Sequence, residues 1–318
     1  MSLPNTANAI ARGSLFPPEL IPEFFNQVRG KSSLAKMCGA SPIPFNGLKE
    51  FTFSMDNEVD IVAEAGAKSA GGGQVGSVTV VPVKIEYGMR VSDEFIFGSE
   101  EVALDYLRAF SEGWSAKVAR GFDIMAMHGV NPRTGSASAV IGNNHLDYVA
   151  STSIVYLNNS STADDNIGAA IDGVQGYDHD VTGAIIGGTA RAALAALEDS
   201  QHRKIYPELK WGGQPGNLNG LPVDFNSTVE YNSAKARAYA GDFQTCFKWG
   251  IAKELPLQVI QFGNPDNDAT AGDLAGHNQV YIRGEAYIGW ASWMRPRSPR
   301  SRPPERHEVQ KPENRERH

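Results

Sequence analysis

The residue types best suited to chemistry do not form a complete catalytic or phosphate-binding pattern in this sequence. Gly30-Lys31-Ser32 ends like a phosphate-binding loop, but Phe25 stands where the first glycine of that loop is required. Gly71-Gly72-Gly73 does not match a dinucleotide-binding fingerprint and is typical of a flexible turn. The sequence has no HExxH, CxxC or GxSxG motif. We therefore expect neither an enzyme nor a bound cofactor.

Two acidic patterns contain residue types that bind metal ions. Asp266, Asp268 and Thr270 are spaced like the start of a calcium-binding loop. The positions for the turn glycine and the closing glutamate of that loop hold alanine and histidine instead. Asp178-His179-Asp180 joins a base to two carboxylates, but neighbouring residues point in different directions on a strand or turn. We expect both patterns to be solvated polar loops without a metal; a weak ion site at the first is the alternative.

Lys68 has a sharper alternative to the ordinary reading of a solvated surface lysine. It lies in a glycine-rich stretch, residues 66–76, that predicts the tip of a hairpin. A lysine at such a tip can contact another subunit or form an isopeptide bond with it. We keep the intersubunit contact as a hypothesis.

Two long strands on either side of this tip are expected to position Lys68. Apolar and polar residues alternate along both, which is the period-two pattern of a half-buried strand. The alternating apolar residues are Phe51, Phe53, Met55, Val59, Ile61, Ala63, Val81, Val83, Ile85, Tyr87, Met89 and Val91. Arms of about 15 residues, at roughly 3.3 Å per residue, extend on the order of 50 Å.

The apolar face of this hairpin needs a cover, because an isolated two-stranded ribbon is only marginally stable in water. The cover is either the rest of the chain or a neighbouring subunit, and the length of the ribbon favours the neighbour. We therefore predict intersubunit contacts at Phe51, Phe53, Val83 and Ile85, in addition to Lys68.

The rest of the chain reads as one long helix, a mixed α/β region and two irregular ends. Residues 99–128 predict a helix of about 45 Å with Ser99 as its N-cap, because apolar residues recur every three or four positions. Shorter helices are expected at 32–38, 165–174 and 190–197, and strands at 182–186, 221–225, 238–243, 257–262 and 279–290. Residues 293–318, rich in proline and charge, are expected to be disordered.

Composition narrows the function classes further. The chain has 318 residues, 41% of them hydrophobic, and a net charge of −7. Residues 295–318 carry eight Lys and Arg against four Asp and Glu, which leaves 21 Lys and Arg against 32 Asp and Glu elsewhere. An acidic body argues against tight binding along a nucleic-acid backbone. Two distant cysteines fit a reducing cytoplasm, and no run of 18 apolar residues predicts a membrane span.

Six short stretches, taken in order, carry a resemblance to a known family. They are residues 15–20, 91–94, 127–129, 220–223, 241–243 with 249–251, and 280–285. In this order the chain resembles the major capsid proteins of tailed bacteriophages, which have the Hong Kong 97 fold that encapsulins share. The resemblance implies an α+β capsid fold and a structural virion subunit; an encapsulin-type nanocompartment shell is the alternative.

The resemblance also implies a division of the chain. The expected parts are an N-terminal arm (1–45), an extended hairpin (46–92), a peripheral domain with a long spine helix (93–140 and 265–292), an axial domain (141–264) and a tail (293–318). In some family members a lysine of the extended loop bonds to an asparagine of another subunit. Lys68 has the right neighbourhood for that lysine, but neither the asparagine nor the catalytic glutamate can be matched here.

The implied partners follow from the same resemblance. The chain would assemble with itself into pentamers and hexamers of an icosahedral shell, in the host bacterial cytoplasm, and would enclose double-stranded DNA without sequence-specific binding. No long coiled-coil-like segment precedes residue 14, so a separate scaffolding protein is expected. A portal and a maturation protease are expected too, and a membrane partner is not.

Overall fold

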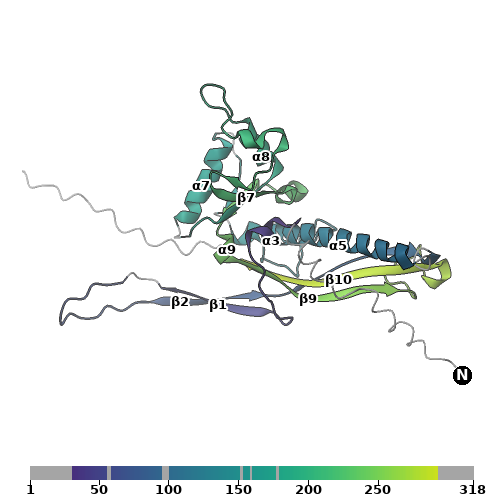
Figure 1. The fold of residues 1–318 in the computed structure, drawn as a ribbon. Coiled ribbons are helices and arrows are strands. Elements are labelled where there is room, and N and C mark those ends of the chain that lie inside the picture. The colour runs from purple at the N-terminus through teal and green to yellow at the C-terminus, as the bar shows by residue number, and fades with distance from the viewer. Residues whose placement is uncertain are drawn as a thin grey trace, which may run out of the picture.

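The structure is a computed structural model that describes residues 31–55, 59–94, 100–150, 153–157, 160–176 and 179–292. Strands in these ranges form a two-stranded, a three-stranded and a five-stranded sheet. Figure 1 shows the five-stranded sheet in an upright unit that stands on a long, flat layer, and the two-stranded sheet projecting from one end of that layer.

The flat layer consists of the long helix α5 (Glu100–His128) lying along a three-stranded antiparallel sheet (Figure 1). The strands run in the order β3 (Val83–Ser92), β10 (Gln279–Ser292) and β9 (Phe247–Ile260). Buried apolar residues of α5 recur every three or four positions, so they share one face that packs on the sheet. They include Leu107, Phe110, Trp114, Val118, Phe122 and Met125.

The centre of this core is aromatic. The ring of Phe122 lies 5.3 Å from that of Trp249 in β9 and 5.8 Å from that of Trp290 in β10. Both tryptophans are almost completely buried. Because large aromatic side chains bury the most apolar area, these contacts are the main anchor of α5 on the sheet.

The upright unit is built on a five-stranded sheet with helices on one face. The strand order is β4 (Ile154–Val155), β8 (Ala238–Gly241), β5 (Gly183–Ile186), β7 (Leu221–Phe225) and β6 (Asn217–Leu218), and only the β5–β7 pair is parallel. Helices α7 (Ala163–Gln175) and α8 (Gly188–Ala196) and the 3-10 segment η1 (Pro207–Gly212) contribute to the same apolar core.

The central strand β5 faces two cores at once. Ala184 and Ile186 belong to the core shared with α7 and α8, whereas Ile185 between them belongs to the core of the flat layer. Alternate residues of a strand point to opposite faces, so one strand connects the two units. The short elements α6 (Leu146–Val149), η2 (Ser227–Ser233), α9 (Phe243–Cys246) and η3 (Ala275–His277) link these parts.

The short helix α3 (Ser33–Met37) is held on α5 by polar contacts. The carboxylate of Asp123 in α5 accepts hydrogen bonds from Ser32 Oγ (2.5 Å), the Ser33 amide (3.0 Å), the Leu34 amide (3.3 Å) and Asn226 Nδ2 (2.8 Å). Burial raises the pKa of Asp123 to about 6, although these donors oppose the shift. The carboxyl group therefore joins three separate segments.

The predicted hairpin is present but shorter than expected. Strand β1 (Leu48–Met55) pairs with β2 (Gly73–Val80) over eight residue pairs. The predicted arm length of about 15 residues is therefore wrong. The return arm ends early because β3, which was predicted to continue it, pairs with β10 over ten residues instead. Pro82 lies between β2 and β3, and its missing amide hydrogen interrupts the ladder there.

Most other predicted elements are confirmed, with one misplaced strand. The helix expected over 99–128 is α5, and the helices and strands expected at 32–38, 165–174, 182–186, 190–197, 221–225, 238–243 and 279–290 are present with shifts of a few residues. The strand expected at 257–262 starts ten residues earlier, as β9, and belongs to the flat layer rather than to the upright unit. Residues 1–30, Ser99 and residues 293–318 lie outside the described part of the chain.

Candidate assembly interface

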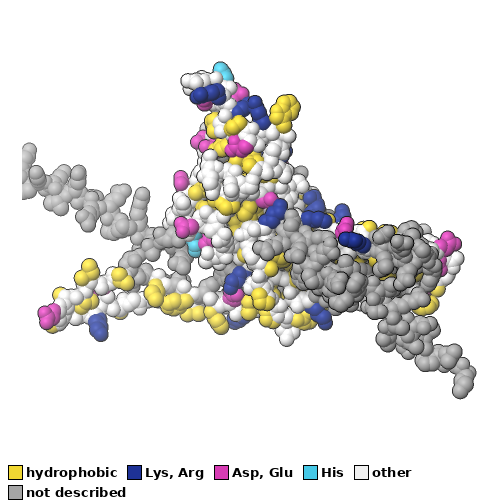
Figure 2. All heavy atoms as spheres, viewed as in Figure 1, with side chains coloured by type: hydrophobic (Ala, Val, Ile, Leu, Met, Phe, Trp, Pro, Cys, Tyr) yellow, Lys and Arg dark blue, Asp and Glu magenta, His cyan; other side chains and the backbone are white. Residues whose placement is uncertain are grey.

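The β1–β2 hairpin exposes a row of large apolar side chains on one face, which we call the bare face. Phe51, Phe53 and Met55 alternate along β1 and are 74%, 60% and 76% exposed. Val75, which pairs with Phe53, is 72% exposed. Figure 2 shows hydrophobic side chains along this projecting ribbon. Contiguous exposed apolar surface of this kind marks an interaction site.

The opposite face of the hairpin is covered by the chain itself at the root. Leu48 and its partner Val80 belong to a small core with Ile43 and Ala291, and Val78 packs against the same core. Since neighbouring residues of a strand point to opposite faces, this contact turns the bare face away from the rest of the chain.

Two further features fix the direction of the hairpin. Lys248 Nζ in β9 contacts both carboxylate oxygens of Glu50, at 2.7 and 2.9 Å. Gly47 has a φ of +84°, and a Cβ there would lie 2.7 Å from the carbonyl oxygen of Val80. The turn before β1 thus depends on glycine, and the ion pair ties the first strand to the flat layer.

The stretch between the two strands continues the exposed surface. Val59 and Ile61 are 96% and 97% exposed, and Lys68 is exposed as well. The described residues 59–72 form no strand, so the predicted alternation up to residue 63 is not a regular ladder. The structure places Lys68 in the outer part of this hairpin, as expected, and leaves its proposed role untested.

Two predicted contact residues do not join the bare face. Val83 and Ile85 lie in β3, where they pair with Ile288 and Ala286, and they pack half-buried against the core under α5. Their alternation reflects burial inside their own chain. Their role as intersubunit contacts stays a prediction, as it does for Phe51, Phe53 and Lys68, but Val83 and Ile85 lie apart from the bare face.

The loop that imitates a calcium site is organised by an arginine. Arg90 donates to both carboxylate oxygens of Asp266, at 2.9 and 2.6 Å, and also to Asn264 and the Gly272 carbonyl. The bidentate bond lowers the pKa of Asp266 to about 2. Asp268 accepts amide hydrogens from its own loop. The two carboxylates therefore brace the loop around a guanidinium group.

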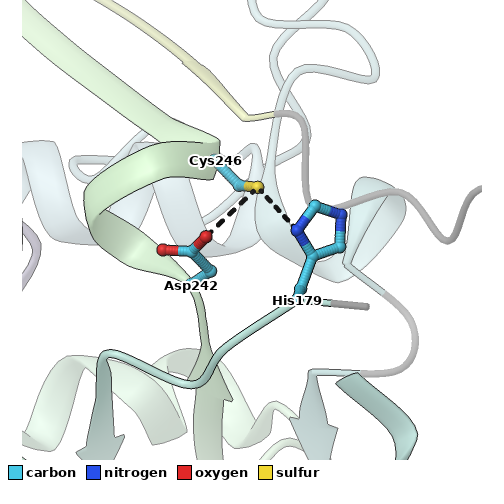
Figure 3. A group of neighbouring side chains, drawn as sticks. All are labelled: His179, Asp242 and Cys246. Atoms are coloured by element: carbon cyan, nitrogen blue, oxygen red, sulfur yellow. Dashed lines mark hydrogen bonds between the residues drawn. The ribbon is translucent and has the colours of Figure 1, made fainter. Parts of the chain in front are cut away.

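His179 is not the exposed turn residue that the sequence predicted. It is half-buried, and its Nδ1 lies 3.7 Å from the sulfur of Cys246 (Figure 3). Asp242 is the third member of this cluster. Sequence reasoning missed it because His179 and Cys246 are 67 residues apart, and no local spacing signals such a contact.

The exposed aromatic residue Trp211 was not among the contact residues predicted from the sequence. Trp211 in η1 is completely exposed and has a φ of +57°.

Among the described residues, none of the helices is long and apolar enough to span a membrane.

Comparison with known proteins identifies the family. The model of the phage capsid family matches residues 12–291. A chain from Mycobacterium phage Ogopogo is 25% identical, with a TM-score of 0.70, over 82% of this chain and 88% of that one. A chain from Gordonia phage Cozz is 21% identical (TM-score 0.64; 82% and 83% covered), and the capsid of an empty GTA particle is 12% identical (TM-score 0.57; 83% and 88% covered).

The two more distant structures support the fold alone, and none of the curated proteins matches the chain. The family match spans the flat layer, the upright unit and the hairpin with its bare face. The chain thus belongs to the phage capsid family and is a major capsid protein of the Hong Kong 97 type, a structural subunit of the head shell.

Proposed function

We propose that the bare face of the β1–β2 hairpin lies on a neighbouring copy of the chain and holds the head shell together. The observation that carries this proposal is the row formed by Phe51, Phe53, Met55 and Val75, each at least 60% exposed. The described residues cover the other face of the hairpin at its root and leave this one exposed. In a shell of identical subunits, the nearest available cover is another subunit.

The energy of this contact supports the assignment. Complete burial of one such side chain contributes about 1.5–3 kcal/mol, so the four together offer several kcal/mol per subunit. Part of that gain offsets the loss of freedom on association. The contact is repeated at every subunit, and a modest net gain at each one stabilises a closed shell.

We assign the flat layer to the peripheral domain and the upright unit to the axial domain, whose copies meet in pentamers and hexamers. Exposed Trp211 fits a contact between axial domains. The revised boundary places residues 247–260 in the peripheral domain, because β9 pairs with β10.

The contents and helpers of the shell are part of the same proposal. The acidic balance outside residues 295–318 fits a wall along which packaged double-stranded DNA slides without specific binding. Assembly in the host bacterial cytoplasm fits two buried free cysteines. A separate scaffolding protein, a portal and a maturation protease complete the pathway. Lys68 is proposed as a contact with a neighbouring subunit.

The decisive experiment places a charge on the bare face. Phe53→Lys and Phe51→Lys should abolish shells in negative-stain electron microscopy while the subunits stay folded by circular dichroism. Gln74→Lys is the matched control, since Gln74 is exposed on the opposite face of the same hairpin and should leave assembly intact. Normal shells from both phenylalanine variants would show that the bare face is not an interface.

Two observations on purified shells test the remaining parts. DNA inside supports the phage head, whereas enclosed protein cargo supports an encapsulin-type compartment. A ladder of crosslinked chains on a denaturing gel that disappears in Lys68→Arg supports an isopeptide bond at Lys68. A single monomer-sized band from mature shells contradicts that bond.

A further inference from the structure

Three side chains with metal-binding atoms meet where the chain crosses from one sheet to another. Asp242 and Cys246 flank α9, which follows β8 of the five-stranded sheet and leads into β9 of the flat layer. His179 comes from the connection between α7 and β5. Figure 3 shows the carboxylate and the imidazole pointing toward the Cys246 sulfur from two sides.

The distances are close to those of a metal site. Cys246 Sγ lies 3.7 Å from His179 Nδ1 and 3.8 Å from Asp242 Oδ2, and the three atoms all lie within 4.8 Å of one another. Tetrahedral zinc, with bonds of about 2.3 Å to sulfur and about 2.0–2.2 Å to nitrogen and oxygen, separates its ligand atoms by roughly 3.3–3.6 Å. The two sulfur contacts need to shorten by only a few tenths of an ångström, whereas the histidine and aspartate ligand atoms, which lie within 4.8 Å of each other, must approach by up to about 1.5 Å.

The local structure aims Asp242 at the sulfur. Its Oδ1 caps α9 by accepting the Thr245 amide at 3.1 Å, and its backbone carbonyl accepts the Cys246 amide at 3.0 Å. The other carboxylate oxygen, Oδ2, then faces Cys246 one turn along the helix. Cys246 and Asp242 are 4% and 6% exposed, so two of the three ligands are fixed in a buried wall.

A catalytic Cys–His–Asp triad does not fit this arrangement. In a triad the carboxylate orients the ring of the base by bonding its second nitrogen. Here the imidazole and the carboxylate both face the sulfur, so the sulfur is a shared centre. The mixture of one sulfur, one nitrogen and one oxygen donor suits zinc, whereas calcium and magnesium prefer oxygen ligands alone.

We propose that His179 Nδ1, Asp242 Oδ2 and Cys246 Sγ bind one Zn²⁺ ion per chain, with water as the fourth ligand. His179 is the one half-buried member of the cluster, so the water is expected on its side. Binding converts the Cys246 thiol to a thiolate and releases its proton to solvent. The bound ion joins the connection before β5 to the segment that enters β9, and so clamps the junction between the upright unit and the flat layer.

The test is a Zn²⁺ titration of the purified full-length chain against a chromogenic chelator, followed by metal analysis after gel filtration. We expect one ion per chain and a higher melting temperature on binding. Co²⁺ in place of Zn²⁺ should give a thiolate-to-metal charge-transfer band. Cys246→Ser should abolish that band and weaken Zn²⁺ binding by about 100-fold or more, a larger loss than the 10–100-fold typical of residues that only support a ligand.

His179→Gln tests the site without disturbing a buried residue, so it remains informative if Cys246→Ser fails to fold. This substitution should weaken Zn²⁺ binding to a similar degree. The control His202→Gln, at an exposed histidine of the upright unit, should leave Zn²⁺ binding unchanged. The protein also carries an internal control. Zn²⁺ should slow alkylation of Cys246, whereas the alkylation rate of Cys38, which is equally buried but lies outside the site, should not change with Zn²⁺.

Three results would overturn the proposal. The first is a chain that retains no zinc after gel filtration and shows no charge-transfer band with Co²⁺. The second is equal affinity in the wild-type chain, Cys246→Ser and His179→Gln, which would assign the metal to other histidines. The third is alkylation of Cys246 at the same rate with and without Zn²⁺.

Discussion

The hairpin and the sheet of the flat layer are made from the same local pattern and differ only in what covers them. Both are antiparallel, and apolar and polar residues alternate in β1 of the hairpin as they do in β3 of the sheet. In the sheet, α5 covers the apolar side, so Ile282 and Ile288 of β10 are completely buried. On the hairpin, Phe51 and Phe53 also share one face of a strand, but they are mostly exposed. Alternation therefore identifies a strand face that needs a cover but does not say which molecule supplies it.

The largest contrast is expected from removing one aromatic side chain in each region. Trp290→Ala in β10 should cost about 3–5 kcal/mol of unfolding free energy, because it leaves a cavity beside Phe122. Phe51→Ala on the hairpin should change that free energy by less than about 0.5 kcal/mol. Urea unfolding of unassembled subunits measures both.

When the direct effect on contacts between subunits is measured instead of subunit stability, the order of the two variants should be reversed. Phe51→Ala should raise the protein concentration needed for shell formation, in proportion to the lost burial at the interface. A large loss of subunit stability in Phe51→Ala would mean that the bare face is covered within the chain, and the comparison would then fail.

A smaller effect is expected where polar contacts hold a segment in place. Asp123→Asn should cost about 1–3 kcal/mol, because one amide cannot accept all four hydrogen bonds that reach the carboxylate. The folded-state pKa of about 6 lies above the ordinary 3.8, so the folded state binds this proton more tightly. Its contribution to stability is therefore largest at low pH and declines as pH rises from about 4 to 6.

Denaturant unfolding at pH 4 and pH 7 checks both parts. The decline with rising pH should be smaller in Asp123→Asn than in the wild-type chain. An unchanged slope would show that Asp123 does not titrate in this range.

The junction between the units offers a pH effect of the same sign, but at higher pH, because the ordinary pKa of histidine lies above that of aspartate. His128 Nδ1 faces Asp147 and Nε2 faces the Thr228 carbonyl, both at 2.8 Å, so two acceptors require both ring nitrogens to donate. Burial lowers the pKa of His128, but the bond to Asp147 outweighs it and the pKa is raised. The stabilisation is complete below pH 6.5 and is lost as pH rises through the folded-state pKa.

We expect Asp147→Asn to cost about 1.5 kcal/mol at pH 6 and less at pH 8. Thermal unfolding at the two pH values gives the comparison, and NMR titration of the His128 ring gives its pKa directly. A cost that does not depend on pH would mean that His128 is neutral in the folded chain.

The smallest effect concerns the root of the hairpin. Lys248→Met removes the ion pair with Glu50. The side chains of Lys248 and Glu50 are 42% and 24% exposed, so the loss should lower the free energy of unfolding by only about 0.5 kcal/mol. The difference from wild type should shrink at high salt because exposed charges are screened. A cost that persists in 1 M salt would indicate that the lysine stem, rather than its charge, supports the hairpin.

The sequence was sufficient where a pattern is local. Helix α5 was predicted to within one residue at its start, because its apolar residues repeat over the full 29 residues. The hairpin strand β1 and the bare residues Phe51 and Phe53 followed from simple alternation. These features require no knowledge of the partner.

The sequence was insufficient where distant segments decide the outcome. Alternation continues across Pro82, so the pattern alone does not reveal that β3 changes sheets and half-buries Val83 and Ile85. The partner of β9 and the meeting of His179 with Cys246 likewise depend on the tertiary fold. The residues of the bare face could thus be found from sequence, whereas its limits could not.

The change of sheets at Pro82 has a mechanical consequence for a container under internal pressure. Tension on the hairpin passes along β2 into β3, because only two residues separate the two strands. The ten residue pairs that bind β3 to β10 lie side by side along that axis, so a pull loads them together in shear instead of unzipping them one after another. The change of sheets thereby anchors the projecting ribbon along ten residues of β10.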